Sequence, residues 1–239
     1  MKNLFNLPNV LTLCNLICGC LAIKLVFTIG LRDTQSVFLI SFGLLVLAAV
    51  FDFFDGFAAR LLKITTPIGK DLDSLADVVT FGVAPGFIVL QYLKLFFSLT
   101  SLDSYYLHYL ALLIPLFSAL RLAKFNNDPR QSLGFIGLPT PANALFFSSL
   151  VLVDSNYIHI VPLLVLICIP LFCYFMISEI PLFALKFKNF AFKGNEIKYI
   201  FLLLCLLMIV LLQLQAMPLI IVLYLLLSII NNKMIKGAK

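Results

Sequence analysis

Long runs of apolar residues constrain this sequence more than any other feature. A membrane-spanning helix needs roughly 20 such residues to cross a hydrocarbon core of about 30 Å. About eight runs qualify, the fifth and eighth being short, and 62% of the 239 residues are hydrophobic, which excludes an ordinary soluble domain. The sequence therefore predicts an all-α integral membrane protein, a single domain over 1–239, with spans at about 8–29, 36–60, 73–98, 105–126, 140–154, 157–182, 197–214 and 217–232.

The basic residues predict how these helices are oriented. If both termini are cytosolic, fourteen of the 17 Lys and Arg residues lie at the inner side, as is usual for membrane proteins. The net charge of +6 then reflects topology and anionic lipid, and nucleic acid is not expected as a partner. We expect a turn at 153–159 and a basic segment on the inner leaflet at about 183–196. No targeting signal is evident, which favours a prokaryotic cytoplasmic (plasma) membrane and leaves an internal eukaryotic membrane as the alternative.

Two pairs of aspartates interrupt the apolar sequence. Asp52 and Asp55 are three residues apart, and Asp73 and Asp77 are four apart, so on helices each pair projects from one face. The segment between the pairs contains Pro and Gly and breaks the helix, which predicts a hairpin that brings both pairs together near the inner surface. Carboxylates are costly in lipid, so the pairs must face a protein interior or a wet cavity. Asp71 falls outside both pairs, and we interpret it as a solvated residue at a helix start.

Four carboxylates require more positive charge than this segment supplies. Arg60 is the one basic residue between the pairs that is expected on a helix. One or two divalent cations would supply the balance, and oxygen ligands without His or Cys select Mg²⁺, Mn²⁺ or Ca²⁺ over zinc. Two such ions held by carboxylates serve phosphoryl transfer in other proteins. Buried ion pairs with a structural role are the alternative.

Two small residues share the helical stripe of Asp52 and Asp55. Gly56 and Ala59 would allow a flat ligand such as a nucleotide to lie directly against the helix. Close helix packing explains small residues equally well.

The whole pattern resembles the signature of the CDP-alcohol phosphatidyltransferases, D-x2-D-G-x2-A-R-x8-G-x3-D-x3-D. Every fixed position and every gap is matched, by Asp52, Asp55, Gly56, Ala59, Arg60, Gly69, Asp73 and Asp77. The resemblance implies the helix bundle of that family and a homodimer. It covers a catalytic core at about 7–183, and a C-terminal helix pair at about 197–232 is additional.

The resemblance also implies a role for each residue of the signature. Asp52, Asp55 and Asp73 would hold two metal ions, Mg or Mn with Ca possible, that bind the diphosphate of a CDP-linked lipid. Asp77 would be a ligand, the base that activates the acceptor alcohol, or both. The residues implied in binding the nucleotide and CDP-lipid are Asp52, Gly56, Ala59, Arg60, Gly69 and, where helix capping is an equal explanation, Thr12.

The flanking sequence is similar to the phosphatidylserine synthase branch of this family. The similar stretches include "LDSLADVVTFGVAPG" at 72–86 and "GFIGLPTPANA" at 134–144. They imply transfer of the phosphatidyl group from CDP-diacylglycerol to serine at the cytosolic face, with CMP leaving. The candidate acceptor residues are Arg121, Asn126, Thr140 and Asn143. A plain inner-side cation is the alternative for Arg121, and a helix-start role is the alternative for Thr140 and Asn143.

Two other functions compete with this interpretation. A synthase that uses glycerol 3-phosphate or inositol phosphate would need a larger basic cluster than Arg121, Lys124 and Arg130 provide. A cation-coupled transporter would place further polar residues across to the other face and would carry an inverted repeat, of which we detect none.

Overall fold

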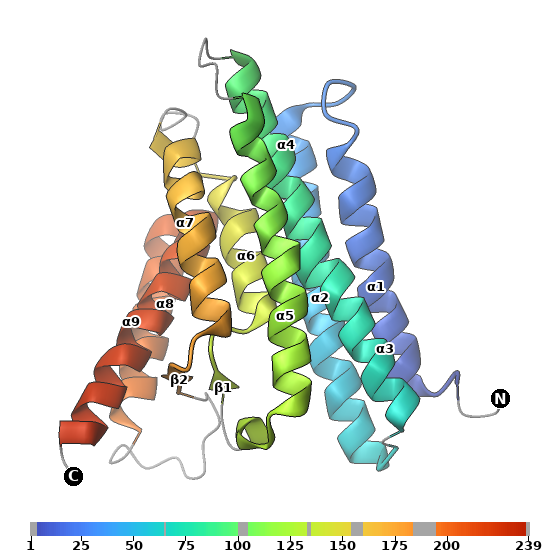
Figure 1. Ribbon diagram of the computed structural model, residues 1–239, viewed down its shortest axis with the longest axis vertical. Helices are drawn as coiled ribbons and strands as arrows, with labels where there is room; N and C mark the ends of the chain where they lie inside the picture. The colour runs from blue at the N-terminus through green and yellow to red at the C-terminus, as the bar shows by residue number, and fades with distance from the viewer. Residues whose placement is uncertain are drawn as a thin grey trace.

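The apolar runs form helices that lie side by side in a bundle (Figure 1). This computed structural model describes residues 4–64, 66–99, 105–132, 135–153, 160–183 and 195–237. The turn predicted at 153–159 and the basic segment predicted at about 183–196 lie almost wholly outside the described residues. The elements are α1 Leu7–Val26, α2 Thr34–Leu62, α3 Pro67–Asp77, η1 Val78–Val83, α4 Ala84–Leu99, η2 Tyr105–Leu112, α5 Leu113–Asn127, η3 Pro129–Ser132, β1 Phe135–Ile136, α6 Thr140–Leu150, α7 Ile160–Ile177, β2 Pro181–Leu182, α8 Glu196–Leu212, η5 Gln213–Gln215 and α9 Ala216–Gly237.

Six helical stretches in the described part of the chain are long and apolar enough to cross a membrane. They are Leu7–Val26, Thr34–Leu62, Pro67–Ser98, Tyr106–Asn127, Ile160–Ile177 and Glu196–Asn232. This confirms the all-α membrane fold class. The number of candidate spans in the described residues differs from the predicted eight for two reasons. Helix α6 has 11 residues, too few to cross alone. Both predicted C-terminal spans, α8 and α9, fall within Glu196–Asn232, where Gln213 interrupts the helix with a φ of 51°.

A short turn after α2 returns the chain as α3. Helix α2 ends at Leu62. The next residue, Lys63, adopts the left-handed conformation, and its N–H donates to the carbonyls of the preceding turn. Thr66 then caps α3 by accepting a 3.0 Å hydrogen bond from the Gly69 N–H, and Pro67 occupies the first turn. Helix α1 packs against both α2 and α3. The sequence therefore forms the hairpin that its Pro and Gly residues predict.

The helix that follows this turn is widened at its centre. Between α3 and α4 lies η1, a π-helical turn in which the Ala84 N–H donates to the Val79 carbonyl, five residues earlier. Such turns occur often at functional sites. Here η1 begins directly after Asp77 and contacts α1 so closely that a Cβ on Gly19 would lie 2.5 Å from Thr80 Oγ1. The absence of a side chain at Gly19 permits this approach.

The core and the outer surface are both apolar, as expected for a bundle in lipid. Helices α6 and α7 meet through aromatic rings, and Phe146 stacks on Phe172 with ring centroids 3.8 Å apart. Outward-facing residues such as Ile167 and Val210 are 66% and 69% exposed, which suits contact with hydrocarbon. The protein is an integral membrane protein on these grounds.

The two ends of the bundle differ. Helix α1 begins and α9 ends at the lower end in Figure 1, where α2 also turns into α3. At the same end β1 pairs antiparallel with β2. Helix α9 holds β2 in place, because Asn232 Nδ2 donates to the Pro181 carbonyl and the Tyr224 hydroxyl donates to the Phe183 carbonyl. These contacts join α9 to β2 and to the residue that follows it.

Candidate active site

Three carboxylates from two helices converge at the lower end of the bundle. Asp52 and Asp55 of α2 and Asp73 of α3 each offer one oxygen, and these oxygens lie within 4.8 Å of one another. Asp55 is buried, and Asp52 and Asp73 are half-buried. One buried oxygen of Asp73, Oδ1, has no hydrogen-bond partner in the described protein. Oxygen donors grouped in this way fit a hard divalent cation.

Asp77 lies beside these three carboxylates, and a hydrogen bond from α1 holds its side chain. Its carboxyl is buried and approaches Asp52 closely enough for a hydrogen bond when one of the two carries a proton. Asn15 of α1 donates to Asp77 Oδ1 at 3.2 Å, and the Thr80 hydroxyl donates to the Asn15 carbonyl. Asp77 therefore has a fixed orientation at the edge of the cluster.

Asn15 is a site residue whose role the sequence did not reveal. It falls three residues after Thr12, which in turn falls three after Asn9, so the three polar side chains form one stripe on α1. Thr12 donates a 2.6 Å hydrogen bond to Asp55 Oδ2. The stripe thus supports both acidic pairs, and its spacing within an otherwise apolar helix is the signal that could have identified it.

A cavity of about 440 Å³ opens beside the carboxylates, between α1, α2 and α3. Its wall includes Thr12, Gly56, Ala59 and Gly69, four of the residues predicted to bind a nucleotide, together with Asp55 and Asp73. A Cβ on Gly56 would meet one atom within 4 Å, the Nη1 of Arg60, at 3.6 Å. Arg60 itself is exposed next to the cavity. Gly56 therefore leaves open space, and close helix packing does not account for it, whereas a Cβ on Gly69 would lie 3.1 Å from both Asn9 Oδ1 and Thr66 Oγ1.

A second set of buried polar groups lies on α5 and α6. Arg121 is 5% exposed, and its Nε and Nη2 atoms have no hydrogen-bond partner among the described residues. The same holds for Thr140 Oγ1 and for both polar side-chain atoms of Asn143. Buried polar groups in proteins are normally paired, so unpaired ones suit a bound polar ligand. Arg121 is also close enough to Asp77 for an electrostatic interaction.

Asn126 differs from the other predicted acceptor residues. Its Nδ2 donates to Ser74 Oγ at 2.7 Å, and its carbonyl accepts from the Lys70 ammonium at 3.4 Å. Asn126 therefore joins α5 to α3 and is not one of the buried groups without a partner. Asp71 is exposed, as predicted, but it does not lie at a helix start, because α3 begins at Pro67 and Asp71 falls in its second turn.

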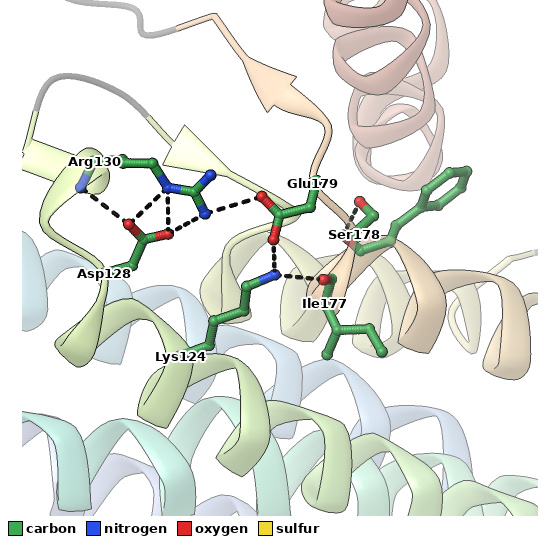
Figure 2. Close-up of polar contacts among 7 residues, drawn as sticks. Lys124, Asp128, Arg130, Ile177, Ser178 and Glu179 are labelled. Atoms are coloured by element: carbon green, nitrogen blue, oxygen red, sulfur yellow. Dashed lines mark hydrogen bonds and ion pairs between the residues drawn. The ribbon is translucent and has the colours of Figure 1, made fainter.

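An ion-pair network closes the end of α5 (Figure 2). Lys124 pairs with Glu179 at 2.5 Å, and Arg130 pairs with both Asp128, at 2.7 Å, and Glu179, at 3.0 Å. The hydrogen bonds from Arg130 lower the pKa of Asp128 to about 2, and the hydrogen bond from Lys124 lowers the pKa of Glu179. Both carboxylates are therefore charged at neutral pH, and the four residues carry no net charge.

Comparison with known proteins places these residues in a family. The sequence profile of the CDP-alcohol phosphatidyltransferases matches residues 5–169. A Helicobacter pylori protein named CDP-diacylglycerol--serine O-phosphatidyltransferase is 31% identical over 234 residues, which cover 95% of this chain and 91% of the relative. A Bacillus subtilis protein of the same name is 34% identical over 190 residues, 80% of this chain and 94% of the relative. An archaetidylserine synthase from Methanothermobacter thermautotrophicus is 34% identical over 146 residues, 60% and 56% of the two chains.

Proposed function

Because the chain belongs to the CDP-alcohol phosphatidyltransferase family, we propose that it transfers the phosphatidyl group of CDP-diacylglycerol to the hydroxyl of L-serine. The products are phosphatidylserine and CMP. One observation carries the proposal beyond the family name. The aspartates of the signature gather beside a cavity, and a buried arginine with unpaired donors, Arg121, lies close enough to Asp77 to interact with it.

The carboxylate group fits a divalent metal. Asp52, Asp55 and Asp73 would hold the ion, and the unpartnered Asp73 Oδ1 supports this assignment. When bound, Mg²⁺ or Mn²⁺ supplies positive charge that stabilises the oxygens of the reacting diphosphate. A second ion would need Asp77 as an additional ligand. Thr12 keeps Asp55 in place through its hydrogen bond, so the ligand geometry does not depend on the ion alone.

The cavity suits the cytidine diphosphate half of the donor. It runs along Gly56 and Ala59 of α2 and reaches the carboxylates at Asp55 and Asp73. A nucleotide lying against these small residues would direct its diphosphate toward the acidic group. The diacylglycerol tails would then extend into the lipid beside the bundle. Arg60, at the rim, would pair with a phosphate.

Asp77 is proposed as the base for the acceptor hydroxyl. The serine oxygen forms a bond to the phosphorus that carries diacylglycerol, the bond from that phosphorus to the CMP oxygen breaks, and the hydroxyl proton passes to Asp77. Asn15 orients the Asp77 carboxyl, which is the positioning that general base catalysis requires. Arg121 would bind the serine carboxylate, and Thr140 and Asn143 offer further polar atoms for the amino acid.

The site is proposed to open at the cytosolic face of a prokaryotic cytoplasmic membrane. The acidic hairpin lies at the end of the bundle where α1 begins and α9 ends (Figure 1), and the distribution of Lys and Arg predicts that this end is cytosolic. A soluble acceptor and a membrane lipid meet most simply at such an interface. A homodimer remains a prediction from the family resemblance.

We expect membranes that contain the protein to convert labelled serine into a lipid product. The reaction should require CDP-diacylglycerol together with Mg²⁺ or Mn²⁺, and CMP should form in equal amount. The measurement is the label in the lipid extract, with parallel incubations in glycerol 3-phosphate and in inositol phosphate. Product with one of those acceptors and none with serine would overturn the serine assignment while keeping the family reaction.

Gly56→Leu should weaken donor binding without unfolding the protein. The new side chain would project into the cavity, where its Cβ meets only the end of Arg60. We expect the dissociation constant for CDP-diacylglycerol to rise at least about tenfold, a change of about 1.4 kcal/mol, with an unchanged melting temperature. Gly43→Leu is the matched control, because Gly43 lies on the same helix outside the cavity, and a Cβ there would meet no atom within 4 Å. Equal binding by both variants would place the donor elsewhere.

A further inference from the structure

We propose that Glu179 and Asp128 determine acceptor specificity by neutralising Lys124 and Arg130. This inference rests on the proposed function, because it concerns which acceptor the same site takes. The two carboxylates would cancel positive charge that otherwise attracts a phosphorylated alcohol. The acceptor region would then offer Arg121 as its buried cation, which matches an amino acid better than a phosphate ester.

The first step of the argument is the pairing itself. The sequence places three cations at this end of α5 and just beyond it, Arg121, Lys124 and Arg130. Lys124 and Arg130 are both engaged by Glu179, and Arg130 is also engaged by Asp128 through three side-chain hydrogen bonds of 2.7 to 3.1 Å. Arg121 takes part in none of the ion pairs formed by the described residues. Two of the three cations are therefore already neutralised by a carboxylate in direct contact.

The second step is the position of the network. Lys124 follows Arg121 by three residues on α5, so the two side chains are about one turn apart on neighbouring positions of one helix. Arg121 is buried and interacts with Asp77, whereas Glu179 and Arg130 are 59% and 60% exposed. The network thus lies at the aqueous end of the helix that carries the proposed acceptor cation. A soluble acceptor would pass within range of its charges.

The third step is that the fold fixes Glu179 on both sides. Before it, the Ile177 carbonyl accepts a second hydrogen bond from Lys124 at 2.9 Å (Figure 2). After it, the Ile180 carbonyl accepts from the Gly137 N–H, and β2 pairs with β1. Gly137 has a φ of 75° and no room for a Cβ, which would lie 2.5 Å from the Met176 carbonyl oxygen. The carboxylate is therefore placed by the backbone and is not a casual surface contact.

The fourth step is the charge of the competing acceptors. Serine carries one carboxylate and one ammonium and has no net charge, so one added cation nearby changes its binding little. A phosphate ester carries close to two negative charges at neutral pH and responds much more strongly. Removing one carboxylate leaves the network with a net charge of +1. The predicted consequence is a gain of phosphate affinity without a matching change for serine.

The test compares serine transfer by wild type and Glu179→Gln at low ionic strength, with sn-glycerol 3-phosphate as competitor. We expect sn-glycerol 3-phosphate to inhibit the variant at a roughly three- to tenfold lower concentration than it inhibits wild type, which is the size of one partly exposed charge interaction. The KM for serine should change less than about twofold. Glycerol, which lacks the phosphate, should inhibit neither protein. Asp128→Asn leaves the same net charge and should give the same result if Glu179→Gln does not fold.

Two further variants separate charge from structural damage. Glu179→Gln combined with Lys124→Gln restores a neutral network and should return the inhibition to the wild-type level. Asp33→Asn, which also removes one carboxylate but caps the distant start of α2, should leave it unchanged. An active single variant with wild-type inhibition, or a double variant that stays sensitive, overturns the proposal alone. Wild-type membranes that form no serine lipid overturn the proposed function and the specificity proposal with it.

Discussion

Asp77→Asn is expected to abolish transfer to serine while CDP-diacylglycerol still binds. The amide has the same shape as the carboxyl and keeps an oxygen that can accept from Asn15, so the fold should be preserved. It cannot take the hydroxyl proton. General base catalysis contributes about 10²- to 10⁴-fold, and we expect turnover to fall by at least about 100-fold.

Two measurements on the same purified variant check this expectation. The first is incorporation of labelled serine, and the second is retention of labelled CDP-diacylglycerol in the presence of Mg²⁺ or Mn²⁺. Asn15→Ala is an informative companion, because it leaves the carboxyl in place and removes its orienting hydrogen bond. It should lower turnover less than Asp77→Asn does. Loss of donor binding together with residual turnover would mean that Asp77 serves mainly as a metal ligand.

The second large loss of activity is expected when a carboxylate of the group Asp52, Asp55 and Asp73 is removed. Asp55→Asn removes one of the three clustered carboxylate charges, while its amide oxygen can still accept from Thr12. The electrostatic stabilisation that a metal supplies amounts to several kcal/mol. We therefore expect transfer to fall by about three orders of magnitude, since each 1.4 kcal/mol is a factor of ten.

The decisive readout for this variant does not depend on activity. Mn²⁺ or Mg²⁺ should raise the melting temperature of the wild-type protein, because a ligand that binds the folded state stabilises it. The ions should have little effect on Asp55→Asn. Asp71→Asn is the matched control on the same hairpin, because Asp71 is exposed and outside the carboxylate group. Equal stabilisation of both variants by the metal would contradict the assignment of Asp55 as a ligand.

The sequence predicted the acidic hairpin because its signals are local. Spacings of three and four place each pair of aspartates on one helical face, and the Pro and Gly between the pairs turn the chain. The sequence left Asp77 open as a ligand, a base or both. In the structure it lies beside the other three, and that depends on the approach of Gly19 to Thr80 and on the Asn15 side chain. These are contacts over more than 60 residues of sequence, which no local pattern encodes.

The ion pairs around Glu179 could not be predicted from the sequence either. The sequence predicts Lys124 and Arg130 as inner-side cations. Their pairing with a residue about 50 positions later could not be foreseen, because it depends on how α7 and β2 return to the end of α5.

The length of α6 was overestimated because the residues after Leu150 remain apolar although the helix has ended.

Because the π-helical turn η1 directly follows Asp77, the number of residues in this turn affects the orientation of the Asp77 carboxyl. A turn closed by a bond over five residues holds one residue more than an α-helical turn, so everything after it is offset by one position, or about 100° of rotation. If all six residues from Val78 to Val83 were instead wound as a regular α-helix, Asp77 would be turned by that angle relative to α4. A further residue inserted in this segment would exceed the one extra residue that the turn holds, and it would rotate the Asp77 carboxyl away from the other carboxylates.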